Sequence, residues 1–456
     1  MDYFSPPNEI DTELRDFLQK SCDLLCNWYS ETTNSEPLPG KMDISSILPE
    51  KDGLSESRLI SDFKLIMDAS FRPSHPGSLA HLDPPPLISS IAADMICAGL
   101  NNNMLANELS PSLSKLEDKV CDWFAKCIGF SESSGGALSS GGSLTNLSAL
   151  VVARNECNLR DDSDAVIIAS KDSHYSLQKA IKVMGLPESS IRRVDTDSEG
   201  RMCLSKIEDE LRSIKNHKKK CFAIVATAGT TIRGSIDPLI DLKKLCVKEG
   251  IWLHIDGAIG GIFGIDKTTK SIVEGLNLAD SLSINPQKIL GIAKTSSILL
   301  LSNKKKLRDT FGTNMPYLEP MINDDINGGE IGIQGTRPAE ILKLWIGLRQ
   351  LGQTGIKSLL QGSINRRVIF EELLDSSKFD IKSGPLHLLA LTPKNMSIDD
   401  SFNWAKRTRE HLLKNSFMIS KPYYSDRHHI KVVFGNPHTS KDHILKLSEL
   451  LNQSIK

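Results

Sequence analysis

Short apolar runs alternate with longer amphipathic stretches over the middle of the chain. Apolar residues fill 165–169, 222–226 and 251–255, and helical patterns such as 238–250 separate these runs. Uninterrupted apolar strands are typical of a sheet buried on both faces, and intervening helices indicate parallel pairing. A further buried strand is predicted at 296–302. The pattern therefore predicts an α/β fold around a mostly parallel sheet.

The two ends of the chain follow other patterns. An opening helix is predicted at 13–29, and a proline-rich loop at 72–77 interrupts the helical pattern that follows. A long helix begins at Pro338, where proline suits the first turn. Strands at 388–391 and 429–434 then precede a C-terminal helix. We predict three parts: an N-terminal helical segment and linker (1–60), a large cofactor-binding domain (61–365) and a small α+β domain (366–456).

Composition and charge narrow the class of protein. Lysine and arginine number 55 against 56 aspartates and glutamates, so no basic excess points to a nucleic-acid partner. No apolar run is long enough to span a bilayer, and the N-terminus lacks the features of a signal peptide. Nine cysteines include no CxxC pair, which favours buried, reduced thiols over metal sites or disulfides. We expect a cytoplasmic protein without a membrane partner.

An acid closes one of the predicted strands, and a lysine follows it on a polar turn. Asp256 ends the 251–255 strand, and Lys288 follows the turn at 285–287. A buried carboxylate needs a partner, and a pyridinium N–H is a suitable one. A lysine amine with a depressed pKa forms a Schiff base with an aldehyde. The pair is therefore what pyridoxal phosphate (PLP) requires, although Lys288 by itself also suits a surface turn.

Three more polar motifs lie beside strand ends, where open parallel sheets bind ligands. Gly142 and Ser143 open a helix whose N-terminus suits a phosphate, although such a turn also caps helices in general. His174 follows the 165–169 strand and can stack on a flat cofactor or simply begin a helix. Thr231 suits a ring or phosphate contact, whereas Asp237 alone also reads as a helix N-cap.

The order and spacing of these motifs, from about residue 60 onward, resemble the PLP-dependent decarboxylases of aromatic amino acids, glutamate, cysteine sulfinate and 2,4-diaminobutyrate. His75-Pro76, the Leu-Asp-Pro-Pro run at 82–85, the Glu-Leu-Ser-Pro run at 108–111 and Gly335-Thr336-Arg337 also match. The resemblance implies the type I fold of PLP-dependent transferases and decarboxylation of an L-amino acid to its amine. It also implies a homodimer with shared active sites.

The resemblance further implies a role for each matching residue. Lys288 would form the Schiff base, His174 would stack on the ring and assist proton transfer, and Asp256 would pair with the pyridine nitrogen. Ala258 would pack against the other face of the ring. The remaining cofactor contacts would come from Gly142, Ser143, Thr231, Asp237, Asn285 and Gln287. The residues expected to face the substrate are His75, Arg337 and Lys431.

Three positions depart from the family pattern. Gln287 stands where histidine usually precedes the lysine, and it can donate to a phosphate but cannot titrate. The stretch 321–334 lacks the tyrosine that reprotonates Cα in many members, and Tyr317 lies just upstream of it. Lys431 replaces an arginine, so carboxylate recognition is less directional. Another PLP reaction at Cα, such as oxidative deamination or desulfination, and a non-catalytic PLP-binding homologue therefore stay open, as does the identity of the substrate.

Overall fold

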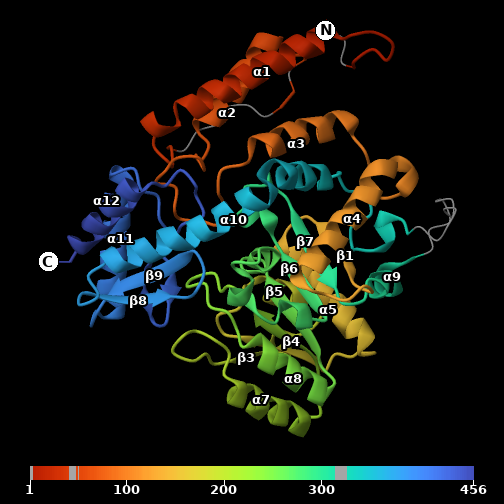
Figure 1. Ribbon diagram of the computed structural model, residues 1–456, viewed down its shortest axis with the longest axis vertical. Helices are drawn as coiled ribbons and strands as arrows, with labels where there is room; N and C mark the ends of the chain where they lie inside the picture. The colour runs from red at the N-terminus through yellow and green to blue at the C-terminus, as the bar shows by residue number, and fades with distance from the viewer. Residues whose placement is uncertain (1–3, 41–47, 50, 314–325, 456) are drawn as a thin grey trace.

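A seven-stranded sheet forms the centre of the protein (Figure 1). The computed structural model describes residues 4–40, 48–49, 51–313 and 326–455. The order across the sheet is β1-β7-β6-β5-β4-β2-β3, with β7 antiparallel to both neighbours and the other pairs parallel. The strands are β1 (Gly135–Ser139), β2 (Ala165–Ser170), β3 (Ile191–Val194), β4 (Lys220–Thr227), β5 (Trp252–Gly257), β6 (Ser281–Ile284) and β7 (Ser297–Leu301). The predicted α/β fold with a mostly parallel sheet is confirmed.

Helices cover both faces of this large sheet, which explains its uninterrupted apolar strands. Ile167 and Ala169 of β2 pack in one core cluster with α5 (Gly142–Glu156) and α6 (Ser176–Val183). The alternate residues Val166 and Ile168 belong to the opposite cluster. That cluster includes side chains of α4 (Pro111–Ile128), α7 (Leu204–Asn216) and α8 (Leu239–Glu249). Because successive side chains on a strand point to opposite faces, every position of β2 is buried.

A smaller antiparallel sheet follows in the chain. Its order is β12-β9-β8, and a two-stranded hairpin of β10 and β11 accompanies it. The elements are β8 (Phe379–Ser383), β9 (Leu388–Pro393), α11 (Ile398–Lys414), β10 (Tyr423–Tyr424), β11 (Arg427–His428), β12 (Ile430–Val433) and α12 (Lys441–Asn452). Figure 1 shows α11 and α12 beside this small sheet.

The helix α10 (Ile341–Leu373) lies between the large and small sheets and is longer than predicted (Figure 1). It bends at Gly352, whose φ of 55° is a left-handed conformation that glycine adopts without steric cost. The boundary that we predicted after residue 365 falls inside this helix. Pro338 marks the start of this helix in the sequence. The residues around 365 include no proline, so nothing in the sequence there marks a domain boundary, and the helix continues to Leu373.

The N-terminal helices α1 (Thr12–Ser30) and α2 (Glu56–Asp68) pack on each other and stand at one end of the molecule (Figure 1). The indole N–H of Trp28 donates to the Met67 carbonyl at 2.8 Å. The helices α3 (Ile88–Leu100) and α9 (Lys305–Phe311) complete the fold. All nine cysteines are unpaired, but Cys22 and Cys26 are exposed on α1, contrary to the expected burial. Among the described residues, no helix is both long and apolar enough to cross a membrane.

Candidate active site

A cavity of about 180 Å³ opens where the parallel strands of the large sheet end. Its walls come from the loops after β1, β2, β4, β5 and β6, which meet at one edge because these helix-connected strands run the same way. Eight predicted site residues lie in its lining: Gly142, Ser143, His174, Thr231, Asp256, Ala258, Asn285 and Lys288. Five other lining residues were not among the predicted site residues: Asn146, Asp172, Thr227, Gly229 and Ile259.

Asp256 lies at the end of β5 and is almost fully buried. Its Oδ2 accepts a hydrogen bond from the Asn146 side-chain amide at 2.8 Å, and its Oδ1 accepts one from the Ala258 backbone at 3.1 Å. Both contacts fix the orientation of the carboxyl group. The signal for Asn146 was its spacing from Gly142, because residues four apart share one face of a helix.

Lys288 closes the short 3-10 turn Pro286–Lys288 and faces the same cavity. Burial lowers the pKa of its amine, while Asp256 and Asp83 oppose that shift. An amine with a lowered pKa has a larger uncharged fraction near neutral pH, and only the uncharged form attacks a carbonyl. The position therefore suits a nucleophilic amine.

His174 begins the turn before α6, and its ring lines the cavity. Its Nδ1 accepts the backbone N–H of Ser176 at 3.2 Å. Burial lowers the pKa of the imidazole, and nearby Asp256 opposes the shift. The ring is therefore neutral at pH 7 with its proton on Nε2, and it can stack on a planar group or donate from Nε2.

The opposite end of the cavity surrounds the first turn of α5. A Cβ added to Gly142 would lie 2.9 Å from Asn285 Nδ2 and 3.5 Å from Ala258 Cβ, so only glycine leaves this space open. The Ser143 hydroxyl and the amides of the helix N-terminus are suitable donors for an anion. Asn285 Oδ1 and Thr227 Oγ1 are buried without a hydrogen-bond partner within the described residues. This donor set and these unsatisfied atoms fit a planar cofactor that carries a phosphate.

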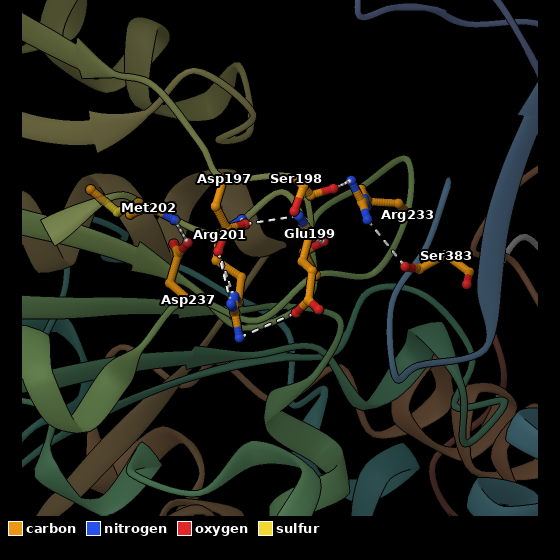
Figure 2. Close-up of polar contacts among 9 residues, drawn as sticks. Asp197, Ser198, Glu199, Arg201, Met202, Arg233, Asp237 and Ser383 are labelled. Atoms are coloured by element: carbon orange, nitrogen blue, oxygen red, sulfur yellow. Dashed lines mark hydrogen bonds and ion pairs between the residues drawn. The ribbon is translucent and has the colours of Figure 1, made fainter. Parts of the chain in front are cut away.

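Two predicted cofactor residues lie outside this lining. Asp237 accepts the backbone N–H groups of Thr227 at 2.7 Å and Met202 at 2.8 Å, so it ties the end of β4 to the segment after β3 (Figure 2). Burial raises the pKa of this carboxyl to about 7. Gln287 turns its side-chain oxygen to the backbone N–H of Ser296. Both oxygens of Asp237 are therefore engaged by backbone donors. Only the side-chain oxygen of Gln287 is engaged, so the expected donation of its amide N–H to a phosphate stays a prediction.

The surroundings of Asp237 form a separate polar cluster that borders a second cavity of about 590 Å³. Figure 2 shows Arg201 between Asp197 and Glu199, with Arg233 donating to the carbonyls of Ser198 and Ser383. These contacts join the loop after β3 to the end of β8. The cluster therefore connects loops of the large sheet to a strand of the small sheet.

None of the three predicted substrate residues belongs to the lining of the first cavity, and two of them make contacts elsewhere. The buried guanidinium of Arg337 makes a two-pronged ion pair with Glu117 of α4, with both N···O distances at 2.7 Å. A fork satisfied in this way is not free to bind a substrate carboxylate. His75 accepts the Gly77 N–H on Nδ1, and its carbonyl accepts the Asn436 amide. It therefore fixes a loop against the segment after β12.

Lys431, the third predicted substrate residue, reaches toward the cavity from β12. Its Nζ lies 3.5 Å from the carbonyl oxygen of the lining residue Thr231, and only 7% of the residue is exposed. Among the described residues no ion pair to Lys431 is found, and Asp83, whose charge acts on it, is paired with Lys294. Burial, together with the nearby charge of Lys288, lowers its pKa to about 8. A second contact is made from the β10–β11 hairpin by Tyr424, whose hydroxyl donates to Asp172 at 2.8 Å.

The loop that we expected to lack the reprotonating tyrosine is described only in part. Tyr317 and residues 321–325 lie outside the described residues. The described remainder begins at Ile326, and its 3-10 turn Gly328–Glu330 approaches the Leu105 backbone through the Gly329 N–H.

Comparison with known proteins places this geometry in context. Residues 42–388 match the pyridoxal-dependent decarboxylase conserved domain. The chain is 28% identical to an aromatic-L-amino-acid decarboxylase of Bacillus atrophaeus, over 92% of this chain and 88% of that protein. It is 24% identical to an L-2,4-diaminobutyrate decarboxylase of Rhizobium meliloti (strain 1021), over 93% and 87%. Among solved structures, mouse CSAD is similar at a TM-score of 0.90 and 22% identity, over 98% of this chain and 99% of that one.

Proposed function

The chain belongs to the pyridoxal-dependent decarboxylase family and is a PLP-dependent lyase that decarboxylates an amino acid, and we propose that Lys288 is the amine that holds the cofactor. The observation that carries this assignment is the meeting of Lys288, Asp256 and His174 in one cavity at the sheet edge. When bound, PLP offers an aldehyde to an amine and a ring that takes up the electrons of the breaking bond.

The lining residues divide the work of binding and orientation. Asp256 would pair with the pyridine nitrogen, and the N–H donors that both of its oxygens accept hold the carboxyl group in place for that contact. His174 and Ala258 would enclose the ring between them. Gly142, Ser143 and Asn285 would hold the phosphate at the N-terminus of α5, where the helix dipole favours negative charge.

Lys431 is proposed as the group that recognises the substrate carboxylate. It is a buried ammonium near Lys288, it has no ion-pair partner within the described residues, and Thr231 of the lining is its neighbour. A buried unpaired charge is costly, and an incoming carboxylate offsets that cost. Because an ammonium is a point charge rather than a planar fork, it tolerates several carboxylate orientations.

His174 is proposed as the proton donor that finishes the reaction at Cα. Its neutral ring carries the proton on Nε2, while Nδ1 is held by the Ser176 N–H. A ring fixed through one nitrogen presents the other in a constant direction.

Product accounting tests this function. The holoprotein is incubated with aromatic and acidic amino acids, 2,4-diaminobutyrate and cysteine sulfinate, and carbon dioxide, amine, aldehyde and ammonia are measured together. We expect amine and carbon dioxide in equal amounts from one of these classes. Aldehyde with ammonia and little amine would instead establish oxidative deamination. No product and no change in cofactor absorbance with any amino acid would establish a non-catalytic homologue.

We also propose that the protein is a cytoplasmic homodimer whose two active sites share residues. Large apolar side chains are exposed on α2 and α3, among them Phe63, Ile66 and Ile96. Exposed apolar surface of this kind marks protein contacts. Sedimentation of the wild-type protein and of Phe63→Lys tests this: a wild-type monomer with full activity would overturn the proposal.

A further inference from the structure

Asn146 lies at the centre of a buried hydrogen-bond chain that connects the interior of the large sheet to Asp256. Its Nδ2 donates to Asp256 Oδ2 at 2.8 Å and to the Ser176 hydroxyl at 3.0 Å. Its Oδ1 accepts the Ser283 hydroxyl at 2.8 Å and lies 3.0 Å from His254 Nε2. Only 1% of Asn146 is exposed, so water does not compete for these contacts.

The contacts allow only one orientation of the Asn146 amide. If the amide were reversed, its oxygen would face the Asp256 carboxylate, and two acceptors would oppose each other. With Nδ2 toward Asp256, the amide oxygen requires donors on its other side. The Ser283 hydroxyl is one, and His254 must supply the second from Nε2.

The protonation of His254 follows from this requirement. The ring is fully buried on β5, and burial lowers its pKa to about 4 although Asp256 opposes the shift. A neutral ring with its proton on Nε2 accepts at Nδ1. The Ser281 hydroxyl lies 2.9 Å from Nδ1 and can donate there, while the indole N–H of Trp252 donates to that hydroxyl at 2.8 Å. The Ser281 carbonyl oxygen, which can only accept, lies 3.2 Å from the same nitrogen. With the His254 proton on Nε2, the donors Trp252, Ser281, His254 and Asn146 form one chain that ends at Asp256.

We propose that Asn146 is a positioning residue that presents Asp256 to the ring nitrogen of the cofactor, and that the Trp252–Ser281–His254 chain fixes Asn146. The inference rests on the proposed function, in which Asp256 faces that nitrogen. The carboxylate is held by donors on both oxygens, and the chain that orients it lies inside the sheet rather than in solvent. A rotated or protonated Asp256 could not keep the ring nitrogen protonated.

Asn146→Asp is the sharpest test because it preserves shape and replaces the donor facing Asp256 with an oxygen. Two carboxyl groups would then share one site, and one of them takes up a proton. We expect the Kd for PLP to rise at least about tenfold, as for the loss of a hydrogen bond to a charged group. The absorbance of the bound cofactor should also gain a pH dependence, and KM for the amino acid should change less than about twofold.

Ser283→Ala is the matched control, because it removes one donor to Asn146 Oδ1 and leaves His254 in place. We expect its Kd for PLP to stay within about threefold of wild type. A wild-type Kd and absorbance in Asn146→Asp would overturn the proposal, as would an equal loss in Ser283→Ala. Thermal unfolding of the cofactor-free variants separates an effect on the site from an effect on folding.

Variants of His254 decide the matter if Asn146→Asp does not fold. His254→Gln retains a side-chain N–H for Asn146, whereas His254→Leu does not. We expect the Kd for PLP to be nearer to the wild-type value in His254→Gln than in His254→Leu. An equal rise in Kd in both variants would contradict the proposed role of the hydrogen-bond chain. Because cofactor binding is measured without turnover, a failure of the decarboxylase assay leaves this test intact.

Discussion

The two sides of the active-site cavity are built in different ways. The cofactor side comes from one sheet: the loops after β1, β2, β4, β5 and β6 bring its residues together, and backbone hydrogen bonds of adjacent strands fix their spacing. The other side includes contacts from the C-terminal part of the chain, made by Lys431 of the small sheet to Thr231 and by Tyr424 of the β10–β11 hairpin to Asp172. We infer that substitutions in the large sheet affect cofactor binding and chemistry, whereas those in the small sheet affect substrate affinity.

The largest effect is expected on the cofactor side. Lys288→Ala removes the amine that bonds to the cofactor, and kcat should fall by roughly 10³-fold or more, comparable to the loss of an essential acid–base group. The apparent Kd for PLP should rise as well. Steady-state kinetics and absorbance titration check both values. Lys294→Ala, which removes an exposed lysine from the same loop, is the control and should retain activity.

The Arg337–Glu117 pair separates stability from catalysis. Arg337→Met leaves the buried Glu117 carboxylate without its partner, and such losses cost about 3–5 kcal/mol of unfolding free energy. Denaturant unfolding measures that value, and KM should stay within about twofold. A stable variant with a strongly raised KM would show instead that Arg337 binds the substrate.

A smaller effect is expected for Lys431, and it depends on pH. Because burial lowers the pKa of this ammonium to about 8, its positive charge is present below that pH and is lost as the pH rises through it. The value of kcat/KM should therefore fall above about pH 8, beyond the fall due to the substrate amine. Lys431→Arg keeps its charge and should flatten this extra decline.

The variant Lys431→Met measures how much the Lys431 ammonium contributes to substrate binding at neutral pH. We expect KM to rise roughly tenfold or more, the effect of losing a hydrogen bond to a charged group, with little change in the Kd for PLP. An unchanged KM in Lys431→Met would remove this residue from the substrate site.

The smallest effect on KM is expected from the hydrogen bond between Tyr424 of the β10–β11 hairpin and Asp172. Tyr424→Phe removes one hydrogen bond and should cost about 1 kcal/mol, seen as a few-fold rise in KM. Burial and then Asp172 raise the pKa of this phenol to about 12, so the effect should not vary with pH below about 10. Tyr423→Phe, at the exposed neighbouring position, should behave as wild type.

The cofactor side was also the more predictable from the sequence. Asp256 closes a strand that the apolar pattern predicts, and Asn285 and Lys288 were found by their turn, because the short strand β6 before them was not predicted. The meeting of these residues at one edge follows from parallel topology. The partner of Arg337 is more than two hundred positions away on α4, and no local pattern reveals it. Asp237 illustrates the same limit, because its backbone partners at Thr227 and Met202 decide its role. The sequence placed Asn146 in a predicted helix but did not indicate its contact with Asp256.

Chemical trapping of the cofactor tests the central claim most directly, because Lys288 and Lys431 are both buried amines near one cavity. The holoprotein is reduced with borohydride, digested and examined by mass spectrometry for the lysine that carries the reduced cofactor. The account predicts a single modified peptide that contains Lys288, with Lys431 unmodified. Modification of Lys431, or of any other lysine in place of Lys288, would contradict it.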